Sequence, residues 1–112
     1  MYLDPFVKTL HLKQQESSDG KVVPLYGKHG TLILQIEDLG DGEVVFQGAV
    51  GSDLSFRNLK GVNMTSNEES DTANSDGIYL INVAGMHKFR AKLQNKTDSE
   101  KCTVVGCFYG QI

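Results

Sequence analysis

The strongest constraint on the fold is a series of short apolar segments, each closed by glycine or by a polar turn. Residues 77–85, Gly-Ile-Tyr-Leu-Ile-Asn-Val-Ala-Gly, place β-branched and aromatic side chains between two glycines, which is typical of a strand. Residues 89–93, Phe-Arg-Ala-Lys-Leu, alternate strictly between apolar and charged side chains. No segment of ten or more residues has the 3.6-residue apolar period of a helix. The sequence therefore predicts an all-β protein.

The connections between these segments predict which strands pair. Residues 77–85, 89–93 and 102–109 are joined by short links, so we expect an antiparallel meander with one face in water. Residues 31–37 and 43–50 flank the turn Asp38-Leu-Gly-Asp-Gly and predict a hairpin. Three further short strands are expected, the first two of them at sheet edges: 7–13, 22–26 with its Pro24, and 54–59.

Seven to nine short strands with turns every eight to twelve residues predict an antiparallel β-sandwich, either Ig-like or jelly-roll-like. A chain of 112 residues suits a single domain. We expect the sandwich to span residues 30–112, and residues 1–29 to form an N-terminal arm or edge hairpin that takes part in assembly. The side chains expected in the core each lie on one parity of their strand: Leu32, Leu34, Ile36, Val44, Phe46, Phe89, Ala91 and Leu93.

Residues 65–76 differ from the rest of the chain. They contain four acidic residues, no aromatic residue and a single alanine as their apolar side chain. This composition predicts a long, exposed and mobile loop that makes few backbone hydrogen bonds.

Charge and composition exclude several classes of partner. The net charge is −3 and the isoelectric point is about 5.5, so neither nucleic acid nor an anionic membrane is an expected partner. No run approaches the ~20 apolar residues of a membrane span, and the first residues lack the pattern of a signal peptide. Cys102 and Cys107 have opposite parity in one expected strand, which predicts two free thiols on opposite faces.

The sequence contains no motif of a catalytic or cofactor site. His11, His29 and His87 have no metal-ligand spacing, and the acidic residues of the 65–76 segment lack the ordered pattern of a calcium loop. No nucleophile motif or phosphate-binding glycine loop is present. We therefore expect no enzyme activity, no cofactor and no metal.

A row of cations is the one candidate interaction face. Lys88, Arg90 and Lys92 share the solvent-facing parity of their strand, and together with Arg57 they suit an acidic protein partner. The alternative is a solvated sheet face whose charges discourage aggregation at an edge.

The order of motifs from Gly30 to Gly110 resembles a small domain that recurs in virion proteins of tailed phages and prophages. The matching stretches are Gly30-Thr-Leu-Ile-Leu-Gln, Val44-Val-Phe-Gln-Gly-Ala-Val-Gly-Ser-Asp, Phe56-Arg-Asn-Leu, Gly77-Ile-Tyr-Leu-Ile-Asn-Val-Ala-Gly-Met, Phe89-Arg-Ala-Lys-Leu and Thr103-Val-Val-Gly. The resemblance implies a β-sandwich on a virion and brings no catalytic residues with it. Residues 1–29 lie outside it.

The resemblance implies a non-enzymatic structural protein, either a capsid decoration or head-fibre protein or an accessory protein of the neck or tail. Such a protein is made in the host cytoplasm, assembles with other virion proteins, and is expected to be a homo-oligomer. The alternative is a carbohydrate- or receptor-binding module of a tail or baseplate, or a lectin-like sandwich. Few aromatic side chains are expected at the surface for stacking on a sugar, namely Tyr2, Tyr26 and Tyr109.

Overall fold

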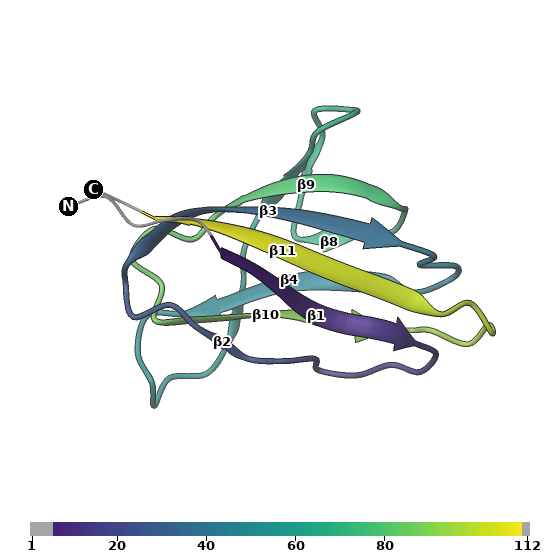
Figure 1. Ribbon diagram of the computed structural model, residues 1–112, viewed down its shortest axis with the longest axis horizontal. Coiled ribbons are helices and arrows are strands. Elements are labelled where there is room, and N and C mark those ends of the chain that lie inside the picture. The colour runs from purple at the N-terminus through teal and green to yellow at the C-terminus, as the bar shows by residue number, and fades with distance from the viewer. Residues whose placement is uncertain (1–5, 111–112) are drawn as a thin grey trace.

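The computed structural model describes residues 6–110, which fold into two antiparallel sheets packed face to face (Figure 1). This arrangement confirms the predicted all-β sandwich, and the described residues contain no helix. There are eleven strands rather than seven to nine, because several edge segments pair over only two residues.

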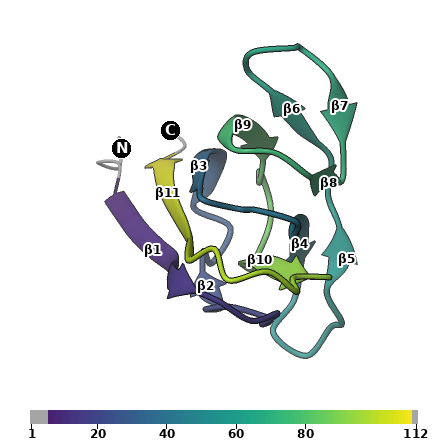
Figure 2. The same ribbon diagram turned by 90° about the vertical axis from the view of Figure 1, so that its right-hand side faces the viewer.

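The larger sheet has six strands in the order β1-β11-β3-β9-β6-β7, as the end-on view in Figure 2 shows. Its strands are β1 (Phe6–Gln14), β11 (Cys102–Gly110), β3 (His29–Glu37), β9 (Gly77–Asn82), β6 (Gly61–Asn63) and β7 (Glu69–Ser70). The second sheet has five strands, ordered β2-β10-β4-β5, with one more strand that pairs with β4. Its strands are β2 (Val23–Pro24), β10 (Lys88–Gln94), β4 (Glu43–Ala49), β5 (Arg57–Asn58) and β8 (Thr72–Ala73).

The predicted strand pairings are wrong. The expected meander of β9, β10 and β11 does not form, because β10 lies in the opposite sheet and β9 and β11 each pair with β3. The expected β3–β4 hairpin is likewise split between the sheets, and β4 pairs with β10. Alternation indicates which side chains face the core, but both sheets share one core, so the pattern does not select the partner strand.

The predicted core is confirmed. All eight side chains expected there have an exposed fraction of 1% or less. Aromatic side chains join the sheets across the core: the ring centroids of Phe89 and Phe108 are 6.2 Å apart, and those of Phe46 and Tyr79 are 5.7 Å apart.

The N-terminal strands are edge strands of this same sandwich. β1 pairs with β11 at the edge of the six-stranded sheet, and β2 pairs with β10 at the edge of the five-stranded sheet. Leu10, Val23 and Leu25 are buried in the common core. The described part of the predicted arm, from residue 6 onward, is therefore built into the two sheets, while residues 1–5 lie outside the described residues. Its part in assembly stays a prediction.

The segment 65–76 is not the unpaired loop that its composition predicts. β7 pairs with β6, and β8 pairs with β4. The Phe46 amide donates to the Asp71 carbonyl at 3.1 Å, and Ala73 enters the core with 1% of its surface exposed. The Asp76 carboxylate accepts hydrogen bonds from the amides of Asp38 and Leu39, at 3.1 and 2.9 Å. Polar composition did not reveal these pairings, because backbone groups make most of them.

Candidate interaction surfaces

The structure brings three of the four predicted cations together. Lys88, Arg90 and Lys92 alternate along β10 with buried Phe89, Ala91 and Leu93, and so lie on the outer face of the five-stranded sheet. Arg57 pairs with Gly48, which lies directly opposite Phe89, so its register places it on the other side of the sheet. The predicted face therefore contains three cations in a row, without Arg57.

Two of these three cations already contact neighbouring groups of the protein. The Arg90 guanidinium lies 4.2 Å from the centroid of the Phe56 ring and 3.5 Å from the Asp19 carboxylate. The Lys88 ammonium lies 4.7 Å from the same ring and donates to the Ser52 carbonyl at 3.1 Å. Lys92 alone has no such contact among the described residues. Of the three cations only Arg90 has a carboxylate partner, so the row keeps most of its positive charge although two of its side chains are held by contacts within the protein.

A chain of hydrogen bonds crosses the same face. Arg90 Nε donates to Gln47 Oε1 at 2.9 Å, and Gln47 Nε2 donates to Asn58 Oδ1 at 3.0 Å. Asn58 Nδ2 then donates to the Asp71 carboxylate at 3.2 Å. This chain of hydrogen bonds runs across β10, β4 and β5, so polar side chains cover this part of the outer face of the five-stranded sheet.

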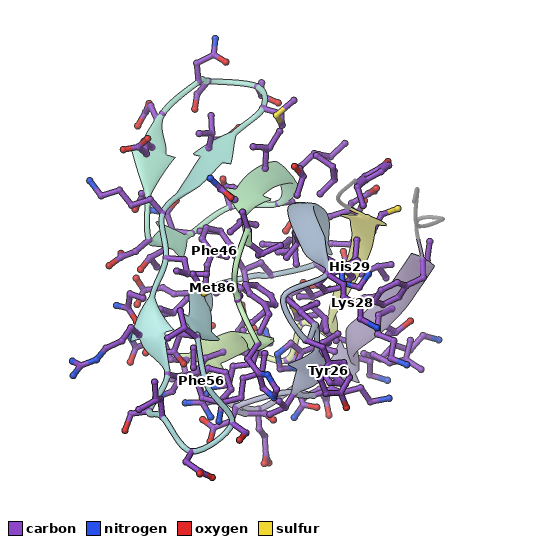
Figure 3. All side chains as sticks on the ribbon, turned by 90° about the vertical axis from the view of Figure 1, so that its left-hand side faces the viewer. Tyr26, Lys28, His29, Phe46, Phe56 and Met86 are labelled. Carbon is purple, nitrogen blue, oxygen red and sulfur yellow. The ribbon has the colours of Figure 1, made fainter. Side chains whose placement is uncertain are left out.

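Arg57 lies beside a hollow at the end of the sandwich. Figure 3 looks at this end, with Tyr26 and Lys28 from the β2–β3 connection, His29 at the start of β3, and Phe56 and Met86 from other loops. The hollow has a volume of about 400 Å³, and Val50 and Leu54 at its rim are 65% and 54% exposed. Both side chains were expected in strands, but β4 ends at Ala49. The hollow is lined by Gly48, Ala49, Val50, Leu54, Ser55, Arg57, Leu59 and Met86.

A second hollow, of about 360 Å³, lies between the β6–β7 hairpin and the β8 segment, and is lined mainly by hydroxyl and amide side chains. Its two aromatic residues, Phe46 and Tyr79, are only 1% and 4% exposed. The Tyr79 hydroxyl donates to the Ser75 carbonyl at 2.8 Å. Because neither ring is open to solvent, this hollow offers no platform on which a sugar ring could stack.

The outer face of the six-stranded sheet carries an apolar row between rows that include Thr9, Thr31, Gln35 and Asn82, and the sequence analysis did not predict this row. Cross-strand partners form one row over five strands: Val7 is opposite Cys107, Cys107 opposite Ile33, Ile33 opposite Leu80, and Leu80 opposite Val62. Cys107, Ile33 and Leu80 each stand between two buried residues and so point away from the core, and Val7 and Val62 are paired with them on the same side of the sheet. Val7 is 67% exposed, and the other four are half-buried by their neighbours in the sheet.

The surroundings of this row add apolar area and little charge. Ile78 and Met64 beside it are 42% and 50% exposed. Among the residues of β11, β3, β9, β6 and β7 that share its outward parity, the only charged ones are Glu37 at the end of β3 and Glu69 on the edge strand β7, while the exposed Lys8 and Lys13 lie on the edge strand β1. Glu69 lies 3.6 Å from the Lys60 ammonium. We call the surface formed by Val7, Cys107, Ile33, Leu80, Val62, Ile78 and Met64 the apolar face.

A sequence signal for the apolar face was present. Residues 77–83 and 102–109 contain apolar side chains on both parities, whereas 89–93 alternates with charged residues. A strand with two apolar parities is typically covered on both sides. Only the register of the sheet, however, places the outward-facing apolar residues of four other strands in one row with Val7.

Two titratable side chains, His11 and Cys102, are buried in the fold. His11 is 4% exposed, and its Nε2 donates to the Ala91 carbonyl at 2.6 Å. Burial lowers the pKa of His11, and burial raises the pKa of the Cys102 thiol to about 11. Cys102 is buried and Cys107 half-buried on the opposite face, both as free thiols, as their parity predicted.

One further cluster locks two turns together. The Lys96 ammonium is fully buried and donates to the Asp98 carboxylate at 2.5 Å and to the Leu39 carbonyl at 3.2 Å. The hydrogen bond from the Lys96 ammonium lowers the pKa of Asp98. Asp41 accepts from the Thr97 hydroxyl and from the amides of Thr97 and Asp98, which lowers the pKa of Asp41 to about 2. The cluster joins the β3–β4 and β10–β11 turns, and each of its charged groups has a hydrogen-bond partner within the cluster.

Among residues 6–110, no three His, Cys, Asp or Glu side chains converge as a group able to hold a metal ion. Over the same residues, no helix is long and apolar enough to cross a membrane. The apolar face therefore remains the surface whose chemistry most needs an explanation.

Comparison with known proteins identifies the fold. No protein-family model matches the chain, and no curated protein sequence matches it either. The crystal structure of the SPBc2 prophage-derived protein YomS matches with a TM-score of 0.82 at 20% identity, over 94% of this chain and 92% of YomS. The PBSX exported protein XepA matches with a TM-score of 0.85 at 17% identity, over 94% of this chain but only 37% of XepA. This chain therefore shares its β-sandwich fold with YomS and with a part of XepA.

Proposed function

We propose that this protein is a non-enzymatic structural component of a phage particle, held there by protein–protein contacts. The observation that carries the proposal is the apolar face, which extends as one row across five strands, whereas the outer face of the other sheet carries a row of cations and a chain of polar side chains. A soluble monomer rarely exposes a contiguous apolar patch of more than a few hundred Å². A surface of this kind is accounted for most simply by a protein partner.

The fold supports the phage part of the proposal. YomS, which matches almost end to end, is described as prophage-derived, and XepA as a PBSX exported protein. The motifs from Gly30 to Gly110 resemble virion domains independently of these two structures. Within a particle, a capsid decoration or head-fibre protein and a neck or tail accessory protein both need a small sandwich that docks on a neighbour. The proposed location is accordingly the virion.

The carbohydrate-binding alternative has less support. Sugar sites typically combine an exposed aromatic ring with polar side chains, and the polar hollow beside β8 has its two rings buried. Tyr26 is 63% exposed, but it stacks edge-on against His87 at 5.2 Å at the other end of β9, away from the hydroxyl-lined hollow. We therefore do not propose a sugar ligand.

The test is to ask whether the protein enters particles through the apolar face. After prophage induction of cells that carry the gene, purified particles are analysed by quantitative mass spectrometry. We expect the wild-type protein in the particle fraction and expect Leu80→Lys, which places a charge in the apolar face, to lower its incorporation at least tenfold. The control Gln94→Lys adds the same charge to the outer face of β10 and should be incorporated normally.

Solubility and melting temperature of both variants are measured first, so that loss of incorporation is separated from loss of fold. A protein that is abundant in the induced cells but absent from the purified particles contradicts the proposed function.

A further inference from the structure

We infer that the apolar face binds a second copy of this chain, so that the protein forms a symmetric dimer with the two six-stranded sheets face to face. The inference concerns the same surface on which the proposed function rests, and it names the first partner of that surface. A twofold axis that lies between the two sheets, parallel to them and passing over Ile33, brings the row of one copy onto the row of the other.

Shape favours this partner. Two sheet faces pack at a separation of ~10 Å with their strands nearly aligned, and each copy already uses that packing between its own two sheets. The row Val7–Cys107–Ile33–Leu80–Val62 runs straight across five strands, with its middle member on the central strand β3. An identical face is a partner of matching width and twist.

Charge favours it as well. The outward-facing residues of β11, β3, β9, β6 and β7 include no Lys or Arg, and the exposed Lys8 and Lys13 lie on the edge strand β1, at the rim of such a dimer. The two outward-facing carboxylates, Glu37 and Glu69, lie toward the ends and the far edge of the sheet, where they stay at the rim of a dimer centred on Ile33. No unpaired charge is therefore buried when two copies meet, and burying such a charge is what most strongly opposes association. The other large face carries Lys88, Arg90 and Lys92, so two copies that met there would bring like charges together.

The area is adequate for a dimer of moderate affinity. The five strands of the row have nine, nine, nine, six and three residues, which at ~3.3 Å per residue and ~4.8 Å between strands gives roughly 600 Å² of face per copy. Stable interfaces bury about 800 Å² per partner. We therefore expect a concentration-dependent dimer rather than a permanent one.

Cys107 provides a reporter inside the proposed interface. It lies in the row between Val7 and Ile33, half-buried in the monomer, whereas Cys102 on the same strand is fully buried in the core. In a dimer, the Cys107 thiol is covered by the second copy. Its alkylation by N-ethylmaleimide should then slow as the protein concentration rises, while Cys102 stays unlabelled throughout.

The experiment measures mass and Cys107 alkylation on the same full-length samples over a concentration series, by sedimentation velocity and by mass spectrometry of labelled peptides. The expected mass of the wild type rises twofold, and its Cys107 labelling rate falls at least fivefold over the same range. Ile33→Lys should stay monomeric with fast labelling at every concentration, and Gln94→Lys should behave as the wild type. Val7→Lys, at a 67% exposed edge position that tolerates charge in the folded monomer, repeats the test should Ile33→Lys unfold.

Two results overturn the dimer: a wild type of monomer mass at all concentrations, or an oligomer in which Cys107 is labelled at the monomer rate. These results are distinct from failure of the proposed function. A monomer that is still found in purified particles removes the dimer alone, whereas a dimer that is absent from particles removes the proposed function alone.

Discussion

At the scale of single residues, His11 shows how one irregularity determines a local environment. Register shifts in the β1–β11 pairing place Leu10 and His11, neighbours in sequence, both in the interior. The imidazole then donates to the Ala91 carbonyl on β10 and so connects the two sheets. Gly20 leaves room for the ring, because a Cβ there would lie 2.6 Å from His11 Nε2 and its φ of +77° disfavours other residues. Strict alternation would have assigned His11 to the same face as Val7 and Thr9.

Burial of His11 predicts a loss of stability in mild acid. The folded state lowers the pKa of His11 below its usual 6.5 because burial disfavours the charged ring. Below pH 6.5 the unfolded chain binds a proton that the folded chain does not, so the free energy of unfolding falls as the pH falls toward the lowered value. Urea denaturation at pH 7.5 and 5.5 should show this decrease in the wild type and a smaller one in His11→Gln. Equal pH dependence in the two proteins would contradict it.

At the scale of elements, the segment 65–76 shows that two-residue strands can be firmly held. β8 is only Thr72–Ala73, yet it pairs with Val44 and Val45 of the central strand β4. Its Ala73 side chain lies in the core beside the larger residues of both sheets. The acidic residues that made the segment appear unstructured are exposed or accept hydrogen bonds, as Asp71 and Asp76 do.

Neighbouring substitutions in this segment should therefore differ sharply. Ala73→Asp places an unpaired carboxylate in the core and should lower the free energy of unfolding by about 3–5 kcal/mol. Asn74→Asp makes the same charge one residue later at an exposed position and should change it by less than about 0.5 kcal/mol. Chemical denaturation of both variants distinguishes a paired strand from a mobile loop, in which the two substitutions would have similar, small effects.

At the scale of the whole molecule, the N-terminal strands close one side of the sandwich. β1 and β2 are the edge strands of different sheets, and both lie beside strands from the C-terminal third of the chain, β11 and β10. Figure 1 shows β1 running alongside β11, at the opposite end of the sequence colours. The aromatic ring of Phe6 stacks on that of Phe108 at 5.0 Å between centroids. The two ends of the described chain thus stabilise each other.

Removal of β1 should accordingly damage the fold rather than only assembly. Deletion of residues 1–14 takes away the pairing partner of β11, the buried Leu10 and the His11 bridge to β10. We expect the truncated protein to lose the cooperative thermal transition of the full chain, as measured by circular dichroism. A truncated protein that melts cooperatively near the temperature of the full chain would show instead that β1 is a dispensable arm, and its oligomeric state would then test the assembly role.

The sequence by itself determined the secondary structure class, the core and the parity of the best strands. Side chains alternate every two residues whatever the partner strand is, so Phe89, Ala91 and Leu93 had to face inward if Arg90 and Lys92 faced water. The same rule separated Cys102 from Cys107. It also placed three cations in one row on β10, because that statement concerns a single strand.

Only the tertiary structure decided what depends on more than one strand. Both sheets bury their inner faces in the same core, so hydrophobic patterning is the same whether consecutive strands pair as a hairpin or lie in opposite sheets. In the structure, β3 and β4 lie in opposite sheets, and β10 lies in the sheet opposite to β9 and β11. Arg57 does not belong to the cationic row, because its register with Gly48 turns it to the other side of the sheet. The apolar face arose in the same way: Val7, Cys107, Ile33, Leu80 and Val62 are far apart in the sequence, and hydrogen-bond register between distant strands is what brings them into one row.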